Sequence, residues 1–314
     1  MHQLVEGLLK GNRRAAARLI SLIENDDQGK RSLLSEIFPF TGKAMIIGIT
    51  GAPGAGKSSL VDGLLKKVRK DGLTAGIIAV DPTSPFSGGA ILGDRIRMQD
   101  HALDPEIFIR SMGTRGNLGG LSRSTREAIQ VLDAFGKDLV IVETVGVGQS
   151  EVDIVRTADT TVVVLTPAGG DSVQTIKAGI MEIADIFVIN KADLPGADRT
   201  ATEINMMLDM NGSKKWRPPV QQTVTIKGEG IDELWQALQD HRAYLAQSGR
   251  LAEVRRQRVR RELTEQVEYL VKQKIWEQVR DRIELDSMVD RINRREEDPY
   301  SAAEGLLKKI DFYR

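Results

Sequence analysis

Eight consecutive residues form a pattern that could hold the phosphates of a nucleotide. The stretch from Gly51 to Ser58 reads GAPGAGKS and satisfies the phosphate-loop pattern GxxxxGK[ST] in full. Its glycines allow the backbone to approach phosphate oxygens, and a helix that starts directly afterwards would aim its amide groups at the same anion. Lys57 would reach the β- and γ-phosphates, and the Ser58 hydroxyl would bind Mg²⁺. We therefore expect a phosphate site made by Gly51, Ala52, Pro53, Gly54, Ala55, Gly56, Lys57, Ser58 and Ser59.

A second pattern, Asn190-Lys191-Ala192-Asp193, would select the base. It matches NKxD and ends an apolar run of strand length. A carboxylate at Asp193 can accept hydrogen bonds from both N1–H and the exocyclic amine of guanine, whereas adenine has an acceptor where guanine has its N1 donor. The stem of Lys191 can lie along the base plane. The expected ligand is therefore GTP or GDP, not ATP.

The stretch Thr225, Ile226 and Lys227 occupies the place where proteins of this kind close over the base with backbone groups. The usual Ser-Ala is missing there, so the pattern at this point is weaker. We expect these three residues to complete the base pocket.

Three carboxylates are placed where they could surround Mg²⁺. Glu143 opens Glu143-Thr144-Val145-Gly146, where ordinary GTPases carry DxxG, and its carboxylate can hold the ion directly or through water. The Gly146 N–H could sense the γ-phosphate. Asp81 ends a predicted strand and Asp94 follows a glycine-rich segment, so either could face the ion. The expected metal ligands are Ser58, Asp81, Asp94 and Glu143, and the expected catalytic residues are Lys57, Asp81, Asp94 and Glu143.

The residue after Gly146 is not the glutamine that positions water in Ras-like enzymes. We therefore expect slow intrinsic GTP hydrolysis that a partner stimulates. Gln149 is a possible substitute, with a polar helix start as its alternative interpretation. The same residues are also consistent with an adaptor that binds GTP without hydrolysing it.

The elements that must position these residues alternate along the chain. Short β-branched runs alternate with helical patterns, which is typical of a parallel sheet covered by helices on both faces. The predicted strands span 44–50, 74–80, 107–112, 138–143, 160–166, 186–190 and 220–225. The predicted fold is an α/β P-loop NTPase with a mostly parallel central sheet flanked by helices.

Helical segments flank this core on both sides. Apolar residues at helical spacing predict two N-terminal helices over the first ~38 residues, joined near Gly11. Residues 250–297 carry a charged surface and an apolar stripe, which predicts a long amphipathic helix or a pair of helices, and a last helix should begin at Asp298-Pro299. The arm could pair with a second copy or fold back on its own domain. We expect an N-terminal helical extension over 1–40, a GTPase domain over 41–246 and a C-terminal helical dimerisation region over 247–314.

The composition excludes several classes of protein. The chain has 314 residues, 44 basic and 44 acidic side chains and no cysteine. Because these charges balance, the chain has no net charge that would attract nucleic acid or an anionic membrane. Because cysteine is missing, no disulfide or thiolate zinc site can form. The first residues lack the features of a secretory signal, and no window has the apolar length of a membrane span. We expect a cytoplasmic protein with no nucleic-acid or membrane partner. The three histidines are isolated and are interpreted as structural or surface residues.

The ordered motifs GAPGAGKS, DPTSP, GDRIRM, RGNLGG, ETVGVGQSE, the Ala-Gly-Gly-Asp segment and NKAD closely resemble the MeaB/ArgK family of methylmalonyl-CoA mutase-associated GTPases, in the SIMIBI class. The resemblance runs from the N-terminal helices to the C-terminal arm. It implies a homodimer held through C-terminal helices, GTP–Mg²⁺ binding, and a chaperone that gates adenosylcobalamin delivery to the mutase and protects or reactivates that enzyme. It also implies a third switch segment, containing Gln174 and Lys177, that faces the mutase.

Two other functions compete with this one. A kinase for periplasmic amino-acid-binding proteins, an older label of the same family, would need ATP, and NKAD argues against ATP. A nickel-type metallochaperone GTPase would be expected to carry cysteines or a histidine-rich tract, and this chain has neither.

Overall fold

A computed structural model describes residues 1–27, 29–81, 101, 103–113, 123–144, 150–167, 181–210, 215–282 and 285–308. Asp81, Ser150 to Val152, Met181 and residues 280–282 are described by their backbone alone. The chain divides into two units, Met1–Ala252 and Glu253–Arg314.

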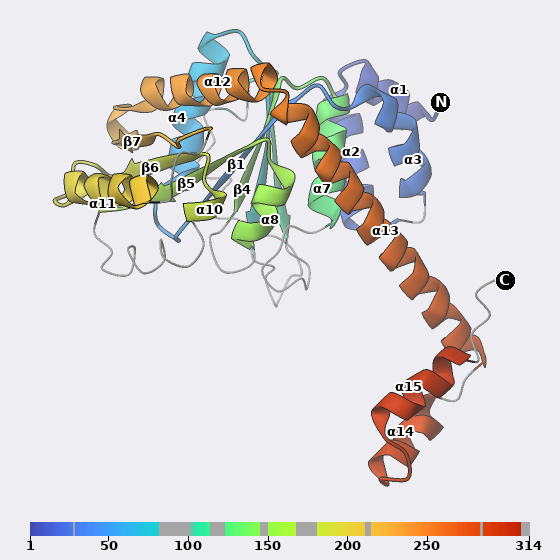
Figure 1. Ribbon diagram of the computed structural model, residues 1–314. Coiled ribbons are helices and arrows are strands. Elements are labelled where there is room, and N and C mark those ends of the chain that lie inside the picture. Colours follow the sequence, from blue (N-terminus) through green and yellow to red (C-terminus); the bar gives the residue numbers. More distant parts are fainter. Residues whose placement is uncertain are drawn as a thin grey trace. The chain divides into compact units, whose positions relative to one another are not determined.

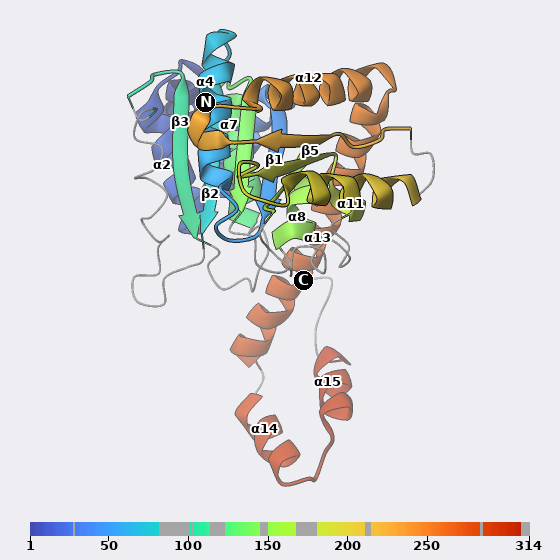
Figure 2. The same ribbon diagram turned by 90° about the vertical axis from the view of Figure 1, so that its left-hand side faces the viewer.

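A seven-stranded sheet forms the centre of the first unit (Figures 1 and 2). The spatial order is β3-β2-β4-β1-β5-β6-β7, and every strand pairing in the described residues is parallel. The strands are β1 (Met45–Gly51), β2 (Ala75–Asp81), β3 (Ile107–Gly113), β4 (Leu139–Thr144), β5 (Thr160–Leu165), β6 (Ile186–Asn190) and β7 (Val220–Thr223). The α/β fold and the seven predicted strands are therefore confirmed, with ends that differ by at most two residues.

Helices cover both faces of the sheet, as continuous apolar strands require. One face packs against α4 (Lys57–Lys70) and α12 (Ile231–Gln247), which share a buried cluster with alternate residues of the strands. The other face packs against α7 (Arg123–Ala134), α8 (Ser150–Thr157) and α11 (Ala197–Met210). The short helix α10 (Met181–Ile183) precedes β6, and the 3-10 turn η3 (Thr225–Lys227) precedes α12.

The N-terminal segment contains three helices, so the prediction of two was wrong. These are α1 (Gln3–Leu9), α2 (Arg13–Glu24) and α3 (Lys30–Ile37), followed by the turn η1 (Phe38–Phe40). The predicted break near Gly11 is present. The missed break follows Glu24, where Asn25 ends α2 and Asp26 adopts a positive φ of 53°. Asn, Asp and Gly residues in the sequence at 25–29 were the turn signal that could have located it.

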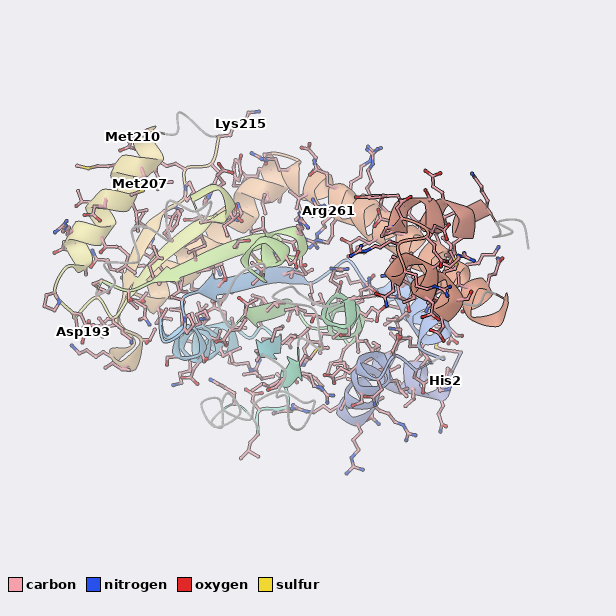
Figure 3. All side chains as sticks on the ribbon, turned by 90° about the horizontal axis from the view of Figure 1, so that it is seen from below. His2, Asp193, Met207, Met210, Lys215 and Arg261 are labelled. Carbon is pink, nitrogen blue, oxygen red and sulfur yellow. The ribbon has the colours of Figure 1, made fainter. Side chains whose placement is uncertain are left out.

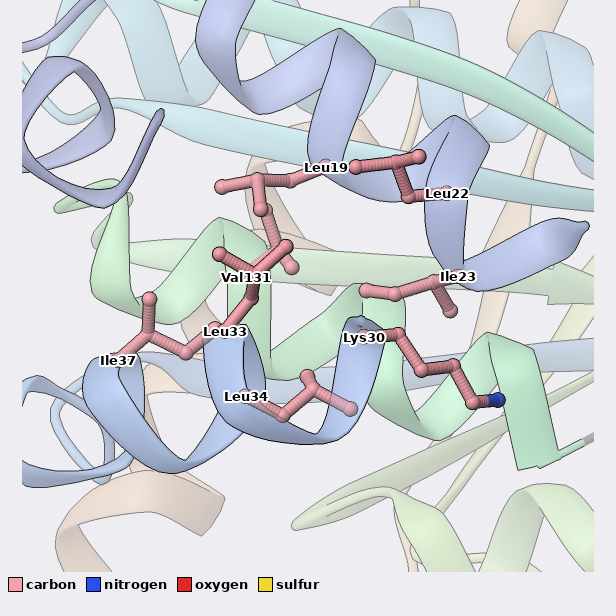
Figure 4. Close-up of a pocket in the computed structure, with 8 residues that line it drawn as sticks. All are labelled: Leu19, Leu22, Ile23, Lys30, Leu33, Leu34, Ile37 and Val131. Atoms are coloured by element: carbon pink, nitrogen blue, oxygen red, sulfur yellow. The ribbon is translucent and has the colours of Figure 1, made fainter. Parts of the chain in front are cut away.

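Helices α2, α3 and α7 surround a small, almost wholly apolar pocket (Figure 4). Its lining is Leu19, Leu22, Ile23, Lys30, Leu33, Leu34, Ile37 and Val131. The ammonium of Lys30 lies 3.0 Å from a carboxylate oxygen of Glu127 on α7 and 2.6 Å from one of Asp26. Apolar packing and this ion pair therefore fix the N-terminal helices to α7.

The second unit is helical. Helix α13 (Arg250–Arg282) begins in the first unit and continues into the second, which also contains α14 (Leu285–Asn293) and α15 (Pro299–Lys308). The predicted start at Asp298 is confirmed, because its carboxylate accepts from the backbone N–H groups of Tyr300 at 2.9 Å and Ser301 at 3.1 Å. Across the part of the chain that is described, no helix combines the length and apolar character needed to cross a bilayer.

Candidate nucleotide site

The phosphate loop joins the central strand β1 to the helix α4. Gly51 ends β1, and Gly56 precedes the first helical residue, Lys57. A Cβ on Gly51 would lie 2.1 Å from the carbonyl oxygen of Val164, and one on Gly56 would lie 2.2 Å from Nδ2 of Asn190. Only glycine fits at these two positions, and both have positive φ angles, 145° and 88°. The loop therefore runs close to its neighbours and opens onto the N-terminal end of a helix of 14 residues.

Lys57 folds back over this loop. Its side chain is buried, and Nζ donates to the carbonyl oxygens of Gly51 at 2.8 Å and Ala52 at 3.0 Å. The ammonium group is therefore held at the loop, where it can contact phosphate oxygens. Ala52, Pro53 and Gly54 are exposed, Ala55 is buried, and Ser59 is half-buried on the first turn of α4.

The hydroxyl of Ser58 meets the carboxylate of Glu143. Ser58 Oγ donates to Oε1 of Glu143 at 2.7 Å, and both residues are buried. Glu143 lies in β4, paired with Ile49 of β1, so parallel pairing carries its carboxylate to the phosphate-loop end of the sheet. Two of the four predicted metal ligands are thus in direct contact.

Asn190 links the base-reading turn to the phosphate loop. The residue is fully buried, and its Nδ2 donates to the carbonyl oxygen of Ala55 at 2.8 Å. Its Oδ1 accepts from the hydroxyl of Thr223 at 3.1 Å and from the backbone N–H of Thr225 at 3.4 Å. One amide side chain therefore joins three parts of the site that are distant in the sequence.

The rest of the NKxD turn faces solvent. Lys191 adopts a positive φ of 59°, and the N–H of Ala192 donates to the carbonyl oxygen of Thr223 at 3.0 Å. Asp193 is exposed and projects from the turn before α11 (Figure 3). The turn thereby places a carboxylate outside the core, where a base could meet it.

The predicted base lid begins beside this turn. Thr225 to Lys227 form η3, and the side chain of Ile226 is 84% exposed. Gly228 ends the turn with a φ of 74°, and an isolated bridge joins Val224 to Glu229. In the structure these residues therefore lie beside the base-reading turn, although the Ser-Ala pattern is missing.

Several predicted site residues fall outside what the structure describes. Asp81 ends β2 in register with Gly113, which puts its backbone at the same sheet edge, while its side chain is not described. Asp94, Gly146, Gln149, Gln174 and Lys177 lie outside the described residues.

Sequence reasoning missed two threonines at this edge. Thr144 Oγ1 donates to Thr50 Oγ1 at 3.0 Å, and both residues are 1% exposed. The available signal was a hydroxyl near the carboxyl end of each of two strands that are apolar over most of their length. Because threonine also favours strands for its shape alone, that signal is weak.

Comparison with known proteins agrees with this geometry. The chain matches the profile of the family described as methylmalonyl Co-A mutase-associated GTPase MeaB over residues 16–280. A Pyrococcus abyssi protein whose name designates it a GTPase is 55% identical over 98% of this chain and 96% of its own length. The methylmalonic aciduria type A homolog, mitochondrial, of Mus musculus is 38% identical over 80% of this chain and 65% of its own length.

A solved structure also covers almost the whole chain. The crystal structure of a LAO/AO transport system kinase matches with a TM-score of 0.71 and 29% sequence identity, covering 98% of this chain and 96% of that one. Together with the phosphate loop and the NKxD turn, these matches identify the chain as a guanine-nucleotide-binding P-loop enzyme. It is a GTPase and belongs to the methylmalonyl-CoA mutase-associated MeaB family.

Proposed function

We propose that this GTPase serves methylmalonyl-CoA mutase or a related cobalamin-dependent acyl-CoA mutase. In this proposal it gates delivery of adenosylcobalamin and protects or reactivates the mutase. Support for the partner comes from the description of the matched family and from the name of the mouse relative. Support for nucleotide control comes from one contact, Asn190 to Ala55, because it couples the base-reading turn to the phosphate loop.

The proposed base contacts follow from the exposure of the Lys191 and Asp193 side chains to solvent. Asp193 would accept from N1–H and the exocyclic amine of guanine, and the stem of Lys191 would lie along the base. Asn190 donates one N–H of its amide to Ala55, and its second N–H would serve the guanine. Thr225, Ile226 and Lys227 would close over the base from the adjoining turn.

The proposed phosphate contacts begin with Lys57. Its ammonium would leave the carbonyl oxygens of Gly51 and Ala52 for the β- and γ-phosphate oxygens, and backbone N–H groups from Gly54 to Ser59 would surround the anion. The Gly146 N–H would contact the γ-phosphate. These groups would bind and orient the nucleotide while water attacks the γ-phosphorus and the bond from that phosphorus to the bridging oxygen of the departing GDP breaks.

The donor set fits Mg²⁺. A hydroxyl and a carboxylate, Ser58 and Glu143, lie 2.7 Å apart at the mouth of the loop, and hard oxygen donors are the ligands that Mg²⁺ prefers. Asp81 and Asp94 complete the proposed set. When bound, the ion would neutralise developing charge on the phosphate oxygens.

Purified mutase provides the direct test. GTP turnover is measured alone and with the mutase, and capture of the mutase is compared in GDP and in a non-hydrolysable GTP analogue. We expect faster turnover with the mutase and capture that depends on the nucleotide.

Lys57→Ala should abolish both effects. Lys66→Ala, which removes an exposed lysine of the same helix, should abolish neither. A mutase that neither binds nor accelerates turnover would refute the partner and leave the GTPase intact.

A second candidate is a kinase, because the LAO/AO transport system kinase structure covers almost the whole chain. This function would use ATP as phosphate donor. The exposed Asp193 favours guanine, so we expect GDP to bind far more tightly than ADP. Calorimetry with both nucleotides separates the two functions, and equal affinity for ADP would favour the kinase.

A further inference from the structure

A pair of buried threonines joins the strand that enters the phosphate loop to the strand that carries Glu143. Thr50 precedes Gly51 in β1, and Thr144 is the last residue of β4. Their hydroxyls are 3.0 Å apart and each residue is 1% exposed. The two side chains are 94 residues apart in the sequence, so the contact exists only because β4 lies beside β1.

This bond lies where the backbone ladder between β1 and β4 stops. The last pair in register is Ile49 with Glu143. Beyond it, Thr50 is in register with Val163 of β5, and Thr144 is in register with Val80 of β2. The hydroxyl pair therefore continues the contact between the two strand ends for one further residue, at the edge where the phosphates would sit.

The pair lies on the opposite face of the sheet from the Ser58–Glu143 bond. Successive side chains of a strand point to opposite faces. Ile141 packs in the α4 cluster, so Glu143 shares that face, whereas Val142 packs in the cluster that includes Ile154 of α8, so Thr144 shares that one. The end of β4 is thus held from both faces, by Ser58 on one side and by Thr50 on the other.

Packing alone does not explain why hydroxyl groups are present at both Thr50 and Thr144. Valine has nearly the same shape as threonine, and replacing both partners of a buried hydrogen bond with apolar groups of equal shape changes stability little. We propose that Thr50 and Thr144 are positioning residues for GTP hydrolysis. Their bond fixes the end of β4, and with it Glu143, relative to the phosphate loop. This inference rests on the proposed role of Glu143.

The full-length double variant T50V/T144V tests the inference. We expect kcat for GTP to fall about tenfold, because loss of a fixed geometry weakens interactions made in the transition state. The affinity for GDP and the melting temperature should stay near those of the parent protein. T50S/T144S, which retains both hydroxyls, should restore most of the rate.

A matched control removes another buried threonine bond from the same sheet. Thr160 lies at the amino end of β5, away from the phosphate loop, and its hydroxyl lies 2.9 Å from Nδ1 of His241. T160V should lower the melting temperature and leave kcat unchanged. An unchanged kcat in T50V/T144V would overturn the inference. So would a double variant that fails to fold or loses GDP affinity, because the bond would then be structural. Failure of the proposed function is distinct: the mutase would then neither bind the parent protein nor accelerate its GTP turnover, whatever the kcat of T50V/T144V.

Discussion

At the scale of single residues, the two polar members of the base-reading turn have different tasks. Asn190 is fully buried and bonds to the phosphate loop and to the start of the base lid. Asp193 is exposed on the same turn. Substitution of the first should disturb the protein as well as the ligand, whereas substitution of the second should act on base selection alone.

Asp193→Asn should therefore change which base is bound. An asparagine amide can donate to the carbonyl that xanthine carries in place of the guanine amine, but it no longer accepts from two donors. We expect GDP affinity to fall about 100-fold, and XDP to bind more tightly than GDP, because buried polar groups of the wrong base would stay unpaired. Calorimetry with GDP and XDP measures both effects. Asp240→Asn, an exposed change on α12, should alter neither, and a variant that still prefers GDP would place base selection elsewhere.

Residue types in the site were predictable where the ligand dictates them locally. Gly51 to Ser58 and the NKxD turn are each continuous in the sequence, and their residue types suit contacts with phosphate and with guanine. The contacts between these motifs were not predictable. Ser58 to Glu143 spans 85 positions and Asn190 to Ala55 spans 135, so both depend on the strand order. The sequence pattern of buried strands predicts a parallel sheet without fixing that order.

At the scale of elements, a buried histidine fixes α12 to the amino ends of two strands. His241 is 2% exposed, and its Nδ1 lies 2.9 Å from the hydroxyl of Thr160 in β5. Its ring packs on Trp216 with centroids 4.7 Å apart, and the indole N–H of Trp216 donates to the carbonyl oxygen of Asp185 at 2.9 Å. The prediction that this histidine is structural agrees with these contacts, although its partners could not be predicted from spacing.

This contact should make the first unit acid-sensitive. Burial lowers the pKa of His241 from 6.5 to about 4, assisted by the nearby Arg250 charge and opposed by Asp159. Because the folded pKa lies below the unfolded one, this stabilisation is complete above pH 6.5 and is lost as the pH falls toward 4. We expect the contribution of His241 to the unfolding free energy to be lower at pH 4 than at pH 7 by up to about 3 kcal/mol.

The measurement is urea unfolding across this pH range for the parent protein and for His241→Gln. Other groups also titrate there, so the difference between the two pH profiles is the quantity to compare. The variant should be less stable at pH 7, and the difference in unfolding free energy between parent and variant should become smaller as the pH falls. His101→Gln, which changes a buried histidine outside this contact, provides the control. A gap that stays constant with pH would mean that His241 is not held neutral by the fold.

At the scale of the whole molecule, the two units differ in how completely they bury apolar surface. The described part of the first has three buried clusters around its sheet. In the described part of the second, the buried apolar residues are Val279, Met288 and Ala302. A helical unit with so small a core usually needs further burial for stability. The predicted alternatives for this arm were pairing with a second copy and packing on its own domain.

We propose that a second copy supplies this burial through α13. Val259, Leu263, Val267 and Leu270 are each at least 40% exposed, and their spacing of four, four and three residues puts them on one stripe. We therefore expect a homodimer.

Leu263→Glu/Val267→Glu should give a monomer in sedimentation velocity at micromolar concentration, because two carboxylates would have to be desolvated at the interface. GTP binding should persist, since the nucleotide site lies in the first unit. Lys272→Glu, outside the stripe, should leave the dimer intact. A parent protein that sediments as a monomer, or a stripe variant that stays dimeric, would instead favour packing within one chain.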